Sequence, residues 1–284
     1  MNIAVPLLLA LSITGDVRKA ATSGDLEGAK KIAESWRQQN GVSPEWLEAY
    51  SWIARGALMS RRYDEAARYA ADTKQQALGM LKGRKLDDER RLPIALGAAI
   101  EVEAQAAAAQ GKRAEAVSYL QGELAKYRDT SIRTRIQKNL NLLSLEGKPA
   151  PAIEGYKLTA APTLVFFWAH WCGDCKSMAE TLGEIRAKFP KLAIAAPTQL
   201  YGYAARGEDA PPAVERKYIQ EVKQQFYPSL KSVPTPVADE TFKVYGASTT
   251  PTLVLVDAKG VVRMYHPGKM TLEQLSDRIR AIEP

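Results

Sequence analysis

The sequence predicts two domains of different class, an all-α N-terminal half followed by an α/β C-terminal half. Residues 16–146 are rich in Ala, Leu, Glu, Lys and Arg and contain few prolines, which is typical of packed helices. Residues 150–284 instead alternate short apolar runs with turn residues and amphipathic stretches. A short proline-containing linker at residues 146–151 separates the halves, and each half is long enough to bury its own core.

Three segments of the N-terminal half resemble one another, and they lie at residues 24–33, 62–70 and 111–120. Each carries an alanine, namely Ala29, Ala66 and Ala116, at the position of close helix contact in the repeat family that it resembles. The segments are similar to the start of the second helix of a tetratricopeptide repeat, although their spacing is irregular. The resemblance implies TPR-like helical hairpins over residues 16–146. Such a domain serves either for packing or dimerisation, or as a docking surface for a protein partner.

The C-terminal half contains a strand–helix–strand pattern followed by a hairpin and a last helix. Apolar runs at residues 163–168 and 191–196 predict strands, and residues 175–189 carry apolar side chains at helical spacing before Pro190 ends the helix. Further segments predict two hairpin strands and a final amphipathic helix, at residues 252–256, 260–265 and 272–282.

The two cysteines of this 284-residue chain lie three positions apart, at the end of the first predicted strand. Cys172 and Cys175 can close a small disulfide ring and reopen it, which is redox chemistry. Zinc binding would need two more ligands, and the chain offers only His170 and His266. A purely structural disulfide across so short a loop would stabilise the fold weakly. The sequence therefore favours a redox-active disulfide.

The predicted helix after the first strand assigns different roles to the two thiols. Cys172 falls at the helix N-terminus, where unpaired N–H groups and the helix dipole favour a thiolate. We therefore expect Cys172 to have a lowered thiol pKa and to act as the nucleophile. Cys175 lies one turn inside the helix and is expected to be the more buried, resolving thiol.

The segment from Phe166 to Lys176, Phe-Phe-Trp-Ala-His-Trp-Cys-Gly-Asp-Cys-Lys, resembles the active-site segment of the thioredoxin superfamily. A second segment, residues 244–260, is similar to the Tyr-Gly…Thr-Pro-Thr block of the same superfamily. The resemblance implies a thioredoxin-like fold in residues 150–284, a thiol–disulfide oxidoreductase activity and a cis-proline at Pro251. It also implies that substrate pairs with the backbone at Thr250. The remaining supporting residues of the site would be Trp171, Gly173 and Asp174, with Gly268 close to the dithiol.

Two positions depart from the superfamily pattern. Asp174 stands where proline is frequent between the cysteines, and its carboxylate would disfavour the Cys172 thiolate and so favour a reducing protein. Phe166 stands where thioredoxin itself has a buried aspartate, so the proton acceptor for Cys175 must come from elsewhere, either from another segment or from water.

An insertion at about residues 197–235 exceeds what a minimal thioredoxin needs and is similar to the TlpA/ResA-like branch, whose members are extracytoplasmic. Its acids are candidates for the group near the dithiol, although a solvated surface is the simpler expectation for each: Glu208, Asp209, Glu215 and Glu221. The resemblance implies no cofactor besides the disulfide, protein thiols and disulfides as substrates, and a thiol-reducing electron donor.

Charge and hydropathy narrow the remaining function classes. The net charge of +7 is spread over helical faces without a basic, aromatic-rich run, which disfavours nucleic-acid binding.

Residues 3–13 are apolar but too short to span a bilayer, so residues 1–15 resemble the core of a signal peptide that lacks a positive leader. We expect a periplasmic or otherwise extracytoplasmic protein, with the cytoplasm as the alternative. The alternative function is a scaffold or chaperone-like binding protein with little redox turnover.

Overall fold

The computed structural model describes residues 12–282 and divides the chain into two compact units, Met1–Ile132 and Arg133–Pro284. Most of the predicted signal-like segment 1–15 lies outside the described residues. Its last residues belong to the first helix, which Ser12 caps by accepting a hydrogen bond from the Gly15 N–H at 3.3 Å.

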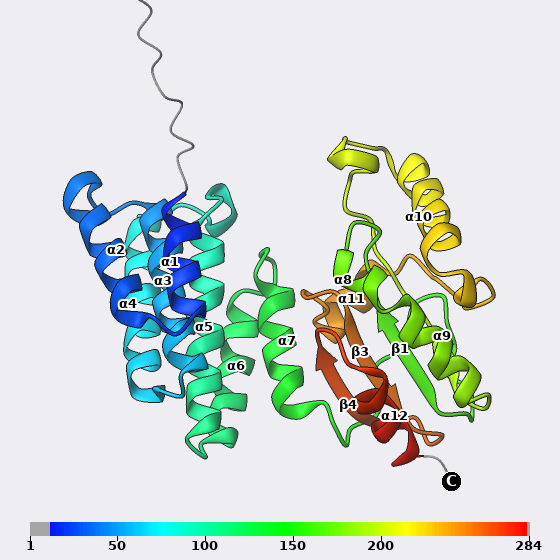
Figure 1. Ribbon diagram of the computed structural model, residues 1–284. Coiled ribbons are helices and arrows are strands. Elements are labelled where there is room, and N and C mark those ends of the chain that lie inside the picture. Colours follow the sequence, from blue (N-terminus) through cyan, green and yellow to red (C-terminus); the bar gives the residue numbers. More distant parts are fainter. Residues whose placement is uncertain (1–11, 283–284) are drawn as a thin grey trace, which may run out of the picture. The chain divides into compact units, whose positions relative to one another are not determined.

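The first unit is helical, and Figure 1 shows its helices in blue and cyan. Its α-helices are α1 (Ile13–Thr22), α2 (Leu26–Asn40), α3 (Pro44–Met59), α4 (Tyr63–Leu81), α5 (Leu92–Ala109) and α6 (Arg113–Lys126), with the 3₁₀ turn η1 (Leu86–Asp88) before α5. Consecutive helices pair as α1–α2, α3–α4 and α5–α6, and the first helices of these pairs also pack side by side. The predicted all-helical N-terminal region is confirmed; its TPR-like nature stays a prediction.

Small residues allow these helices to approach closely. Ala29, Ala66 and Ala116, which mark the three similar segments, are all buried at the starts of α2, α4 and α6. Alanine costs nothing in side-chain entropy and leaves room for a neighbouring helix. The three sequence segments therefore coincide with the second helix of each pair.

Helix α5 is the one described helix whose length and composition would suffice to cross a membrane. Of its apolar window, 61% is buried inside the first unit, against α3, α4 and α6. A helix that is apolar on all sides is what the centre of a packed helical unit requires.

The second unit is built on a four-stranded mixed sheet with strand order β2-β1-β3-β4. Its strands are β1 (Thr163–Phe167), β2 (Ala193–Ala195), β3 (Thr252–Val256) and β4 (Val262–Pro267). Strand β1 runs parallel to β2 and antiparallel to β3, which pairs in turn with β4 as the predicted hairpin. A thioredoxin-like α/β domain after a helical region is therefore the observed architecture.

Side chains alternate between the two faces of this sheet, as the pleat requires. Phe166 and Leu253 face the core beneath α9 (Ala179–Lys188) and α12 (Leu272–Arg280). Phe167 and Val254 face the opposite core, which α11 (Asp239–Tyr245) covers. Tyr156 and Leu158, from the loop before β1, pack against the same core.

Helix α7 (Arg133–Ser144) belongs to the second unit, so the packing boundary falls before the linker at 146–151 that the sequence suggested. The amide of Asn141 donates to the Tyr245 carbonyl at 2.9 Å, which ties α7 to the end of α11. The linker itself lies along β4, because Gly147 N–H donates to the Val262 carbonyl and Val262 N–H to the Lys148 carbonyl. These long-range contacts leave no local signal in the sequence.

The predicted helix 175–189 is divided into α8 (Gly173–Ser177) and α9 by Met178, whose φ of −87° and ψ of −3° interrupt the regular turn. The insertion continues from β2 through the 3₁₀ turn η2 (Ala205–Gly207), helix α10 (Pro212–Phe226) and the 3₁₀ turn η3 (Pro228–Leu230). Figure 1 shows α10 in yellow, on the side of the sheet that α8 and α9 cover.

Replacing Gly246 by alanine should destabilise the second unit. Gly246 ends α11 with a φ of +63°, and a Cβ there would overlap the backbone of Gln137 and Lys138 in α7. We expect Gly246→Ala to lower the free energy of unfolding by on the order of 3 kcal/mol, from left-handed strain plus the overlap. Denaturant titration measures the change.

The matched control is Gly260→Ala, where φ is +78° but no atom lies within 4 Å of the added Cβ. This control should cost only about 1–2 kcal/mol, the strain of a left-handed non-glycine residue. Equal losses in the two variants would contradict the close approach of α7 to Gly246.

Candidate active site

The two cysteines form a disulfide at the carboxyl end of β1, with their Cα atoms 5.2 Å apart. Cys172 caps α8, and its Sγ accepts a hydrogen bond from the Cys175 N–H at 3.0 Å. Only 3% of Cys172 and none of Cys175 is exposed, whereas Trp171 is 48% exposed beside them. The order of burial agrees with an outer Cys172 and an inner Cys175.

Antiparallel pairing of β1 and β3 brings a second loop to the disulfide. Phe167 at the end of β1 lies opposite Thr252 at the start of β3, so the residues after β1 meet the residues before β3. The Thr250–Pro251 peptide bond is cis, as expected. The Thr250 carbonyl oxygen lies 3.4 Å from Cys172 Sγ.

Gly268, directly after β4, contacts the loop that contains Pro251. Its N–H donates to the Pro251 carbonyl at 2.8 Å, and its φ of +104° is a conformation that favours glycine. The next residue, Lys269, forms an ion pair with Asp174 at 2.9 Å, in which both side chains are at least half exposed. The charge of Asp174 is thus partly balanced at the surface.

The side of β1 beneath the disulfide is apolar. Phe166, at the position where thioredoxin has its aspartate, is buried and packs near the ring of Tyr227, with centroids 6.2 Å apart. Trp168 packs edge-on to the same tyrosine and donates its indole N–H to the Ala196 carbonyl at 3.0 Å. Aromatic rings therefore fill the core at the position where thioredoxin has its aspartate.

Glu215 of α10 is fully buried, unlike the other acidic residues considered in the insertion, Glu208, Asp209 and Glu221. Its Oε1 lies 3.1 Å from His170 Nε2, and His170 is itself fully buried two residues before Cys172. Burial lowers the pKa of His170, and the hydrogen bond to Glu215 raises it again only in part.

The sequence marks His170 and Glu215 separately, and no local pattern pairs them. The signal lay in α10, where Glu215, Ile219 and Val222 share one helical face and are all buried. A carboxylate on the apolar face of an amphipathic helix indicates a buried partner. Its partner could not be found by spacing, because 45 positions separate Glu215 from His170.

Residues 149–283 match a family model described as a thioredoxin-like domain, which covers less than half of the chain. The second unit contains a thioredoxin-like domain. The chain is also 27% identical over 151 residues to the thiol:disulfide interchange proteins DsbE of Xylella fastidiosa strains Temecula1 and 9a5c. Each alignment covers 49% of this chain and 70% of the relative.

Two solved structures are similar to the thioredoxin-like domain. One is a secreted disulfide oxidoreductase of Mycobacterium tuberculosis, at 19% identity and a TM-score of 0.35, covering 48% of this chain and 96% of that one. The other is the pneumococcal exposed lipoprotein thioredoxin Etrx1 of Streptococcus pneumoniae, at 19% identity and a TM-score of 0.35, covering 47% of this chain and 98% of that one.

The disulfide, the matched family model and the DsbE relatives together support a thiol–disulfide oxidoreductase. Within residues 12–282, no cluster of three or more His, Cys, Asp or Glu side chains is arranged to hold a metal ion. His266 of β4 is partly exposed, and its Nε2 lies 3.1 Å from the Lys269 carbonyl oxygen at the rim of the site.

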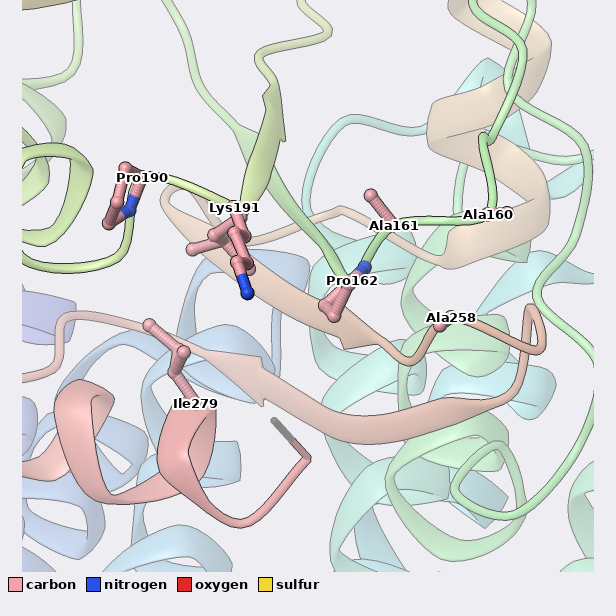
Figure 2. Close-up of a pocket in the computed structure, with 8 residues that line it drawn as sticks. Ala160, Ala161, Pro162, Pro190, Lys191, Ala258 and Ile279 are labelled. Carbon is pink, nitrogen blue, oxygen red and sulfur yellow. The ribbon is translucent and has the colours of Figure 1, made fainter. Parts of the chain in front are cut away.

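A pocket of about 430 Å³ in the thioredoxin-like domain lies away from the disulfide. Pro162 precedes β1 and Ala258 follows β3, so both mark the end of the sheet opposite Cys172 (Figure 2). The lining is apolar apart from Lys191, and it includes Ile279 of α12. Its position separates this pocket from the redox site.

Acidification should destabilise the thioredoxin-like domain through His170. Because the folded state lowers the pKa of His170, the unfolded chain binds more protons once the pH falls below the ordinary histidine value. We expect the free energy of unfolding to fall from about pH 6.5 downwards, by at most about 1.4 kcal/mol per pH unit for this one group. Urea titrations at pH 7.5 and 5.5 measure the slope.

His170→Gln should flatten this slope, whereas His266→Gln should keep it, because the partly exposed His266 lies in β4 and takes no part in the buried contact with Glu215. A wild-type slope that survives in the His170 variant would show that other groups cause the pH dependence.

Proposed function

We propose that the protein exchanges thiols and disulfides with protein substrates through Cys172 and Cys175, and that it works in the reducing direction. One observation carries this proposal: the Cys172 sulfur lies between the start of α8 and the Thr250 carbonyl, at the junction of two loops. Trp171, Gly173, Asp174 and Pro251 are proposed to support the dithiol there.

The reducing reaction uses two exchange steps. The Cys172 thiolate attacks a substrate disulfide, which forms a mixed disulfide and releases one substrate thiolate. The Cys175 thiolate then attacks the Cys172 sulfur, which releases the second substrate thiolate and leaves the Cys172–Cys175 disulfide. Two electrons pass to the substrate, and an external dithiol donor must return them.

A peptide substrate is supported by the backbone near Cys172. An extended segment can pair with main-chain groups beside Thr250, in the manner of a strand added to an edge, and place its own sulfur at Cys172. The half-exposed ring of Trp171 offers an apolar surface next to this position. Both features suit a polypeptide disulfide better than a small free disulfide.

The reducing direction is supported by the electrostatics of the motif. A carboxylate at Asp174 disfavours the Cys172 thiolate and therefore the reduced protein relative to the disulfide.

We further propose an extracytoplasmic location, which the apolar run at residues 3–13 supports as a signal-like sequence feature.

Cys172→Ser should abolish insulin reduction, because the variant has no thiol to attack the substrate. Cys175→Ser should instead accumulate mixed disulfides at Cys172, since the resolving thiol is missing. The assay is insulin turbidity with dithiothreitol, together with mass spectrometry of trapped adducts.

Wild-type turnover no faster than that of Cys172→Ser would favour the alternative function, a scaffold or chaperone-like protein that binds partners with little redox turnover. Adducts trapped on Cys175 in the Cys172→Ser variant, with none on Cys172 in its counterpart, would reverse the assigned roles.

Asp174→Asn should make the protein more oxidising, because the change removes a negative charge beside the thiolate. Since Lys269 pairs with Asp174 at the surface, we expect a modest rise, on the order of threefold in the equilibrium constant against glutathione, or about 15 mV. Lys269→Gln should shift the potential in the opposite direction. A potential in Asp174→Asn that is unchanged or more negative would contradict this account.

A further inference from the structure

The buried pair of His170 and Glu215 joins the insertion to the active-site loop. Both side chains are 1% exposed, and their hydrogen bond links α10 to the residues directly before Cys172. The exchange reaction described above does not use either residue. A buried carboxylate destabilises the fold unless it is well hydrogen-bonded, so the hydrogen-bond partners of Glu215 show which segments it holds together.

Glu215 is held by three donors. Oε1 accepts from the Tyr201 N–H at 2.6 Å and faces His170 Nε2 at 3.1 Å, while Oε2 accepts from the Gly202 N–H at 2.9 Å. Backbone N–H groups stabilise the ionised form of a carboxyl group. The geometry therefore describes a carboxylate fixed on the loop that follows β2.

His170 fits this carboxylate as a neutral donor. Its Nε2–H points to Glu215, while its Nδ1 is buried without a hydrogen-bond partner in the described part of the protein. An unpaired lone pair at Nδ1 costs less than an unpaired N–H of an imidazolium. The rings of Tyr218 of α10 and of Tyr201 and Tyr203 in the loop after β2 pack edge-on to His170. The charged groups that act on it are Glu215 and, through its field, Lys176 of α8.

Besides the hydrogen bond of His170 to Glu215, a contact of Trp171 also joins the active-site loop to the insertion. The ring of Trp171 packs edge-on to the ring of Tyr201, with centroids 5.4 Å apart, and the Tyr201 N–H is one of the donors to Glu215. Two adjacent residues before Cys172 are thus both tied to the loop that Glu215 holds. Displacement of this loop would move the residues that position the Cys172 sulfur.

The buried charge also lies on the dithiol side of the domain. The second buried carboxylate in the described residues of the domain, Asp257, lies at the opposite end of the sheet, bonded to Lys259, Val261 and Arg263. A carboxylate in the interior is screened less than one at the surface. Its field should disfavour a thiolate at Cys172 more strongly than the solvated Asp174 does.

We propose that Glu215 is a positioning residue for the Cys172–Cys175 disulfide: through His170 it fixes the insertion on the active-site loop and places a buried negative charge behind the dithiol. This inference rests on the proposed function, because it concerns the redox chemistry of the same disulfide. It assigns to the insertion a direct part in setting how reducing the protein is.

The experiment compares redox equilibria against glutathione for the full chain and its Glu215→Gln variant. Loss of the charge should stabilise the reduced form, so we expect a potential less negative by about 30 mV, equivalent to on the order of tenfold in the equilibrium constant. Alkylation of Cys172 should shift to lower pH in the same variant. The matched control is Glu221→Gln on the same helix, where the side chain is 57% exposed and lies 3.9 Å from Lys217.

A wild-type protein that does not exchange with glutathione would overturn the proposed function itself. Normal exchange with the same potential and alkylation profile in wild type and Glu215→Gln would overturn only the positioning role, even if the variant were less stable. His170→Leu, which removes the donor, should loosen the pair, and His170→Gln, which keeps an N–H donor, should restore most of the wild-type potential.

Nuclear magnetic resonance provides a test that leaves both His170 and Glu215 unchanged. The chain contains two histidines, so the His170 ring nitrogens can be assigned by elimination with His266→Gln. We expect a neutral ring protonated at Nε2, with nitrogen shifts that change when the disulfide is reduced. A ring protonated at Nδ1 alone, or one insensitive to reduction, would contradict the proposal.

Discussion

The antiparallel pairing of β1 with β3 is the constraint on which the redox site depends. Cys172 follows one strand and Pro251 precedes the other, so their proximity is a consequence of register: Phe167 opposite Thr252 fixes which loops meet. A slip of one residue would turn every side chain of β1 to the other face and carry the disulfide with it. The alternation of Phe166 and Phe167 between two separate cores makes such a slip costly, and the apolar faces thereby secure the chemistry at the end of the strand.

Electrostatics around the dithiol are divided between surface and interior. Asp174 and Lys269 form an exposed pair that salt screens, whereas Glu215 is buried and bonded on both oxygens. Salt therefore weakens the field of Asp174 and Lys269, whereas the field of the buried Glu215 is screened less. A site with Phe166 in place of a strand carboxylate can therefore still have an acid close to its active-site loop, supplied by a different segment of the chain.

Much of this arrangement was predictable where the signals are local. The strands near 163–168 and 252–256, the Cys172–Cys175 pair and the cis peptide before Pro251 all follow from patterns within a few residues or from a resemblance carried by them. The break at Met178 left no signal in the sequence pattern. The contact of His170 with Glu215 left none either, because it depends on packing between distant segments. Glu215 was among the candidate acids, but exposure was the expectation for all four, and only the buried face of α10 distinguishes it.

Helix α7 determines where this chain can be divided into fragments that keep the contacts of the second unit. A family match beginning at residue 149 describes where sequence similarity starts, whereas the folded body starts at Arg133. A fragment cut at the similarity boundary would lose the amide that bonds the Tyr245 carbonyl, together with the α7 backbone that lies against Gly246. The chain therefore does not divide into its two units at the proline-containing linker, and recombination between relatives at that linker would separate α7 from α11 and β4, which it contacts.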